Sequence, residues 1–173
     1  HVVAGGSFVE AGVGFAGVVL AVLGLVHVAP GYMASIATLA IGAALAFEGA
    51  ALRGRSSNWT MPAEFTAGMA GVVLGILAIL GIEPGILVPV AVIVFSAGLL
   101  LGTGAHLQFG AEGTLATSGS HVLCGLAGVI LGIMALVGTA TLTLSLVALL
   151  TLGLSTMCCG TLLGEHMAGI WRR

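Results

Sequence analysis

Apolar residues occur along the chain in six long runs, which short polar segments or Pro-Gly pairs separate. Strict alternation of apolar and polar residues, which is typical of half-buried strands, is absent, and an open sheet cannot lie in lipid. Each run is close to the ~20 residues that a helix needs to cross a bilayer. The pattern predicts six transmembrane helices, at about 8–28, 31–52, 63–82, 85–107, 119–137 and 141–163.

The first helix of each pair carries the same arrangement of residues. An ionisable residue is followed by small residues four, seven, eleven and fourteen positions later, a spacing that lies on one face of an α-helix. In a membrane protein such a face packs against other helices. The three copies are Glu10-Gly14-Gly17-Ala21-Gly24, Glu64-Gly68-Gly71-Gly75-Ala78 and His121-Gly125-Gly128-Gly132-Ala135.

Short connections join the helices of each pair: Ala29-Pro30-Gly31, Glu83-Pro84-Gly85 and Gly138-Thr139. Pro and Gly end one helix and begin the next, so each pair is predicted to be a tight hairpin. Offsets of 54 and 57 residues superpose the three anchors, which indicates a tandem repeat. We therefore predict a single transmembrane domain over 1–173, with hairpin repeats at about 7–53, 61–107 and 118–166, in a pseudo-threefold bundle. The Gly-rich first helices are expected inside this bundle and the bulkier second helices outside, towards lipid.

Composition supports a membrane location. The chain is 59% hydrophobic and only 6% charged, whereas soluble domains carry about 25% charged residues. Its mean hydropathy is +1.25. A net charge of −2 argues against nucleic acid as a partner, and three cysteines form no disulfide framework. The four Arg residues fall on one predicted side, so the positive-inside rule makes both termini cytoplasmic: Arg53, Arg55, Arg172 and Arg173.

Most titratable residues of the predicted spans collect near the cytoplasmic boundary. Carboxylates with histidines suit iron, manganese or zinc, and His with Cys suits zinc or copper(I). Two histidines at similar depth also suit the axial positions of a haem. A structural reading stands beside this one, because a carboxylate in the first turn of a helix is favoured by free N–H groups and the helix dipole. The candidate metal ligands are Glu10, Glu48, Glu64, His106, His121, Cys124 and Cys159.

The hairpins resemble the HdeD-like short-repeat membrane proteins. The resemblance lies in the segments 17–30, 71–84 and 128–138, in which small residues lead to a turn, and the third segment lacks the turn Pro. It implies a six-span fold and an acid-stress or envelope role, and it supplies no catalytic residues.

These observations predict a small non-enzymatic membrane protein that acts as a scaffold or accessory subunit. Its expected partners are the lipid bilayer and other membrane subunits or further copies of itself. The alternative is a metal- or haem-binding membrane protein that uses the layer of Glu, His and Cys. A third hypothesis, a small transporter or proton pathway, is disfavoured because the ionisable residues lie near one face only.

Overall fold

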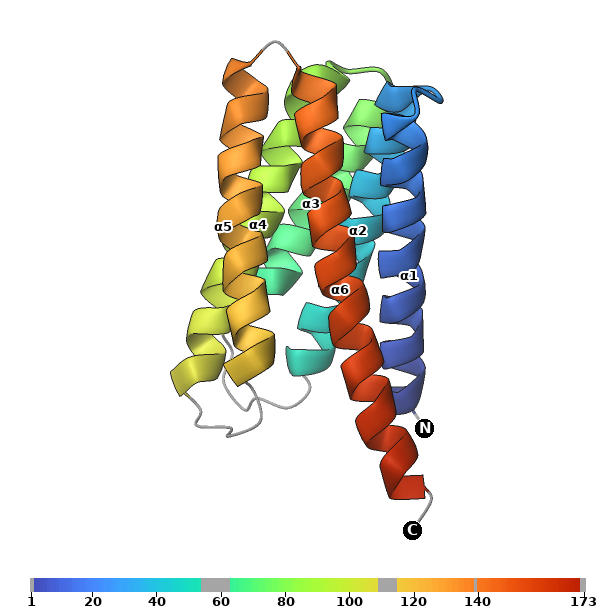
Figure 1. Ribbon diagram of the computed structural model, residues 1–173, viewed down its shortest axis with the longest axis vertical. Coiled ribbons are helices and arrows are strands. Elements are labelled where there is room, and N and C mark those ends of the chain that lie inside the picture. Colours follow the sequence, from blue (N-terminus) through green and yellow to red (C-terminus); the bar gives the residue numbers. More distant parts are fainter. Residues whose placement is uncertain (1, 54–62, 109–114, 139, 172–173) are drawn as a thin grey trace.

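The computed structural model describes residues 2–53, 63–108, 115–138 and 140–171, and the side chains at 12–50, 63–102, 122–138 and 140–157. The described residues form six α-helices and no strands, which confirms the prediction of an all-helical fold. The helices pack side by side into one elongated bundle (Figure 1). They are α1 (Val2–Leu25), α2 (Pro30–Arg53), α3 (Ala63–Ile79), α4 (Pro84–Gln108), α5 (Leu115–Val137) and α6 (Thr141–Trp171).

Consecutive helices form three antiparallel hairpins. The turns from α1 to α2, α3 to α4 and α5 to α6 lie together at one end of the bundle, here named the turn end (Figure 1). The first residue of α1 and the last residues of α6 lie at the opposite end, here named the terminal end. Residues at equal distances from their turns therefore lie at similar heights in the bundle.

The first two hairpins turn in the same way. His27 (φ 68°) and Gly81 (φ 85°) end α1 and α3 in the left-handed conformation. Each donates its N–H to the carbonyl three residues before it, and the next residue donates to the carbonyl five residues before it, as in a Schellman motif. The bonds are His27–Gly24 (3.0 Å), Val28–Leu23 (3.1 Å), Gly81–Ala78 (3.1 Å) and Ile82–Leu77 (3.2 Å). Pro30 and Pro84 then begin α2 and α4, where the missing N–H of proline costs no helical bond.

The second helices of the hairpins lie at the centre, which makes the prediction that the Gly-rich first helices lie inside wrong. The inner helices, α2, α4 and α6, contact one another. The outer helices, α1, α3 and α5, each contact two inner helices, and the described residues show no contact between one outer helix and another. The most extensive contacts join an inner helix to the outer helix of another hairpin: α2 with α3, α4 with α5, and α6 with α1.

The core explains this arrangement. Large apolar side chains of the inner helices fill the centre and are inaccessible to solvent, among them Ile41, Phe95 and Leu149. The buried residues of α3, in contrast, are Glu64 and small residues only. A helix with one small face can lie in the groove between two inner helices, while its large side chains point away from the bundle.

Glycines bring the helix backbones into contact. A Cβ at Gly68 of α3 would collide with the backbone nitrogen of Ala46 and lie 2.7 Å from the carbonyl oxygen of Gly42, both in α2. Similarly, a Cβ at Gly153 of α6 would lie 3.2 Å from the carbonyl oxygen of Gly14 in α1. The small-residue face predicted from the sequence is therefore the contact face of the outer helices, as in other close helix pairs.

Two helical segments of the described residues are long and apolar enough to cross a membrane. They are Pro30–Ala50, with a mean hydropathy of 1.6, and Pro84–Gly102, with a mean hydropathy of 2.4. Four shorter apolar helical stretches accompany them, at Gly12–Leu25, Ala63–Ile79, Val122–Val137 and Thr141–Met157.

Candidate functional site

The seven predicted metal ligands are distributed over all six helices. Glu10 lies in α1, Glu48 in α2, Glu64 in α3, His106 in α4, His121 and Cys124 in α5, and Cys159 in α6. The side chains of Glu10, His106, His121 and Cys159 lie outside the described residues. The structure therefore tests the predicted layer only through Glu48, Glu64 and Cys124.

Glu64 is the most deeply buried of the three predicted ligands whose side chains are described. It lies in the first turn of α3 and is only 4% exposed. Its carboxyl group occupies the space that a Cβ at Gly102 of α4 would need. The side chain therefore fits between α3 and α4 only because residue 102 is a glycine. The start of a helix also favours a carboxylate, through the helix dipole and the free N–H groups.

Glu48 of α2 and Glu64 of α3 lie at similar heights along the bundle. Gly49, which follows Glu48, packs against the backbone of Phe65, the residue that follows Glu64, so α2 and α3 bring the two glutamates to the same level. Glu48 is half-buried, whereas Glu64 is buried. Two of the predicted ligands thus share the terminal half of the bundle.

Cys124 is a free, half-buried thiol in α5. Within the described side chains, no three His, Cys, Asp or Glu residues lie close enough together to hold a metal ion. The hypothesis of a metal site also includes four ligands whose side chains are not described. The metal or haem site accordingly stays a prediction.

Buried hydroxyl groups form a feature that the sequence analysis missed. Most of them donate to a carbonyl oxygen one turn earlier in their own helix, which satisfies the hydroxyl inside an apolar core. The bonds are Ser35–Gly31 (2.8 Å), Thr38–Ala34 (2.8 Å), Ser96–Val92 (2.7 Å), Ser145–Thr141 (2.7 Å) and Thr156–Gly153 (3.0 Å). Ser155 differs, because its buried hydroxyl oxygen has no hydrogen-bond partner. Ser and Thr at otherwise apolar positions of the second helices were the available signal.

These hydroxyls face different helix pairs. Ser96 of α4 packs against Gly128 of α5, whereas Thr156 of α6 packs against Gly14 of α1. These two hydroxyls therefore line separate helix interfaces.

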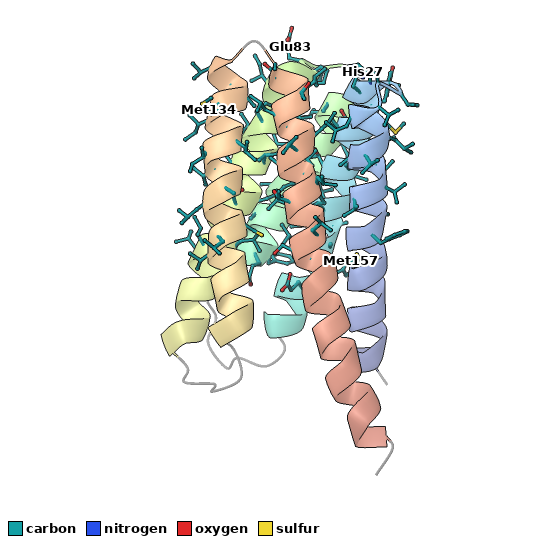
Figure 2. The ribbon with its side chains drawn as sticks, viewed as in Figure 1. His27, Glu83, Met134 and Met157 are labelled. Atoms are coloured by element: carbon teal, nitrogen blue, oxygen red, sulfur yellow. The ribbon has the colours of Figure 1, made fainter. Side chains whose placement is uncertain are left out.

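The outside of the bundle is apolar along most of its length. Figure 2 shows side chains pointing outward from α1 and α5 between the level of the labelled Met157 and the turn end. Large exposed residues occur on all six helices, for example Phe15, Phe47, Val73, Leu101, Ile130 and Leu154. The exposed titratable residues of the described side chains are His27, Tyr32 and Glu83, all towards the turn end, where Figure 2 labels His27 and Glu83.

Two shallow grooves lie on this surface, one between α3 and α4 and one between α2 and α3. Ala67 and Gly98 line the first, and Phe47 and Met69 line the second. Neither groove is lined by a titratable side chain, and Thr66 contributes a hydroxyl group to the first.

No protein-family model, curated protein sequence or solved structure matches this chain. The resemblance to HdeD-like proteins therefore remains a prediction from the repeated segments, and the function is argued below from the chain's own residues.

Proposed function

We propose that this protein is a small non-enzymatic integral membrane protein, acting as a scaffold or accessory subunit of a larger membrane assembly. Its six helices would span the bilayer as three hairpin repeats in a pseudo-threefold bundle, with both termini in the cytoplasm. One observation carries the membrane location: large apolar side chains cover the outside of the described bundle, and between its two ends that outside carries no charge.

The described outer surface is apolar, as the core is. The buried polar residues include Glu64, Thr38 and Ser96, whereas Val73, Leu80 and Ile130 each expose more than half of their surface. Between the two ends, the described outer surface carries no charged side chain. A soluble protein normally covers its surface with charged and polar residues, and exposed apolar patches of this extent are typical of surfaces that meet lipid or another protein.

Two lysine substitutions, one within α3 and one directly after it, test the membrane location. Val73 is 53% exposed and lies near mid-height, and Leu80 is 70% exposed and lies near the turn end. In lipid, lysine at the helix centre costs about 2.5–3.5 kcal/mol, whereas a lysine near the end can reach the headgroups. On a protein surface in water both substitutions stay within about 0.5 kcal/mol of neutral.

The experiment compares Val73→Lys with Leu80→Lys, measuring membrane retention after alkaline extraction and thermal stability in lipid nanodiscs. We expect Val73→Lys to lose retention or stability and Leu80→Lys to behave like the parent protein. Equal behaviour of the two variants, or release of the unmodified protein by alkali, would overturn the membrane assignment.

The scaffold role is supported by the exposed apolar faces of α1, α3 and α5. It predicts that native membranes solubilised in mild detergent yield the protein with stoichiometric membrane partners or as an oligomer. Glu64→Gln should retain that association. A monodisperse monomer without partners would contradict the scaffold role while leaving the membrane location intact.

The metal or haem alternative is supported by the shared level of Glu48 and Glu64 in the terminal half of the bundle. Elemental analysis and an absorption spectrum of the purified protein decide it. Near-stoichiometric metal or a haem band that is lost in His121→Ala and Glu64→Gln would favour this function. A colourless, metal-free protein would exclude it.

A further inference from the structure

The third hairpin differs from the second at one pair of equivalent positions. The repeat offset of 57 residues relates positions 67 and 98 of the second hairpin to positions 124 and 155 of the third. In the second hairpin, Ala67 and Gly98 pack directly together, because a Cβ at Gly98 would lie 2.5 Å from the Cβ of Ala67. In the third hairpin the same positions hold Cys124 and Ser155. A thiol and a hydroxyl thus replace two of the smallest residues.

The contacts of neighbouring residues place Ser155 on the side of α6 that faces α5. Leu152, one turn before Ser155, approaches α5 so closely that its Cδ2 atom would lie 3.9 Å from a Cβ at Gly128. Helices α5 and α6 are antiparallel (Figure 1), so one turn further towards the terminal end leads from Leu152 to Ser155 and from Gly128 back to Cys124. The thiol and the hydroxyl therefore belong to the same level of the α5–α6 contact.

The hydroxyl group of Ser155 is buried without a partner. Ser155 is only 6% exposed, and its hydroxyl oxygen makes no hydrogen bond. The adjacent hydroxyl of Thr156, in contrast, donates to the carbonyl oxygen of Gly153 in its own helix. A buried hydroxyl that lacks a partner is unfavourable. A ligand at this level of the α5–α6 contact would supply that partner.

We propose that the α5–α6 contact binds a thiophilic metal cation of the zinc or copper(I) class, with the Cys124 thiolate as a ligand and the Ser155 hydroxyl as an adjacent oxygen donor. Cys124 is a free, half-buried thiol, and thiolate is a preferred ligand of these ions. On binding, the ion replaces the thiol proton, which passes to solvent. The site rests on the metal alternative of the proposed function, and it places the ion in the third hairpin instead of at the level of Glu48 and Glu64.

The next turn towards the terminal end offers two further ligands in the sequence. His121 and Cys159 occupy the repeat positions of Glu64 and Gly102. In the second hairpin these positions are in contact, because the carboxyl group of Glu64 lies where a Cβ at Gly102 would be. The side chains of His121 and Cys159 lie outside the described residues, so their part in the site is a question for variants.

Metal titration of the full chain tests the site. The protein is purified in mild detergent with a reductant, stripped with a chelator, and titrated with Cd²⁺, whose ultraviolet charge-transfer band reports bound thiolate. Competition by Zn²⁺ and by Cu⁺ against Cd²⁺ then separates the two ions of the class. We expect saturable binding of about one ion per chain, as a single site requires.

Variants locate the ion. Ser155→Ala should weaken zinc binding by about 10–100-fold, as the loss of a supporting polar group does, and Cys124→Ala should weaken it further and reduce the charge-transfer band. His121→Ala and Cys159→Ala are titrated alongside. The matched control is Glu64→Gln in the second hairpin, which should bind zinc as the parent protein does.

Thermal unfolding gives a second readout that separates a ligand role from a packing role. Without metal, Ser155→Ala should unfold at a higher temperature than the parent protein, because it loses a buried hydroxyl without a partner. With zinc, the midpoint of the parent protein should rise more than that of Ser155→Ala. Equal rises in the two proteins would contradict the role of Ser155.

The outcomes distinguish the two proposals. If the parent protein binds none of these ions, the metal alternative and the site in the third hairpin are both wrong. If it binds them and Cys124→Ala retains full affinity, the metal alternative stands and the site in the third hairpin is wrong. Loss of binding in Glu64→Gln with retention in Cys124→Ala would place the ion at the level of Glu48 and Glu64.

Discussion

Replacing Gly68 by alanine gives the sharpest test of the observed packing, because the new methyl group meets backbone atoms only. A Cβ at residue 68 would collide with the backbone nitrogen of Ala46 and lie 2.8 Å from its Cα. No side-chain rotation can relieve these contacts. Helices α2 and α3 must therefore move apart along a contact that is among the most extensive in the bundle.

The expected magnitude follows from two opposing terms. Alanine in a helix interior is favoured over glycine by about 0.5–1 kcal/mol. Overpacking of a tight contact costs about 1–3 kcal/mol, and more when backbone has to shift. We expect Gly68→Ala to lower the free energy of unfolding by about 1–2 kcal/mol in total.

Gly12 of α1 supplies the matched control. It lies in a helix, is exposed, and a Cβ there meets no atom within 4 Å. Only the helix-propensity term applies, so Gly12→Ala should raise the free energy of unfolding by about 0.5–1 kcal/mol.

The assay is reversible unfolding in mixed detergent micelles, followed by circular dichroism at matched protein concentrations. Opposite signs for the two variants are expected. If Gly68→Ala is as stable as Gly12→Ala, the α2–α3 contact is looser than the structure places it, and the argument from backbone contact fails.

Three further predictions concern single residues, each read from the same unfolding assay. His27→Gly should stabilise the protein by about 1 kcal/mol because it removes a side chain from a left-handed position, whereas Gly81→Ala at the corresponding turn should destabilise it similarly; equal effects of the same sign would contradict the turn geometry. Ser155→Ala should stabilise by about 1 kcal/mol because it removes a buried hydroxyl without a partner, and a loss of stability would show that the hydroxyl is bonded. Gly102→Ala should destabilise the protein by displacing the carboxyl group of Glu64, and this cost should shrink by about 0.5–3 kcal/mol in a Glu64→Ala background. Additive effects of the two substitutions would show that the two residues do not interact.

Pro and Gly residues in the sequence predict the ends of the helices that they flank. The expected span 31–52 corresponds to α2, Pro30–Arg53, and 85–107 corresponds to α4, Pro84–Gln108. The last helix was predicted to end near 163, but α6 continues to Trp171. Its final turns contain polar residues, Glu165 and His166, which the apolar pattern does not include. Hydropathy reports the apolar part of a helix, and a helix can continue beyond it.

The candidate site was harder to predict. The spacing of Glu64 ahead of its small residues placed it on the contact face of its helix, and the structure buries it there. The glycine that makes room for its carboxyl group, Gly102, was not recognised, because that contact joins two helices and no local pattern encodes it. The unbonded hydroxyl of Ser155 was missed for the same reason, since a serine in an apolar helix is normally satisfied by its own backbone.

The exchange of inner and outer helices has a more general cause. In most soluble proteins polarity distinguishes the inside from the outside, but here both are apolar, so only side-chain size and the number of contact faces remain. Each inner helix contacts four other helices, and each outer helix contacts two. A helix with four neighbours needs apolar residues around most of its circumference, whereas a helix with two neighbours needs one narrow contact face. A stripe of small residues on one face, with large residues such as Val73 and Ile76 on the other, therefore indicates a helix at the periphery of an apolar bundle. Such a stripe indicates that helix backbones approach closely, and close approach does not require a central position.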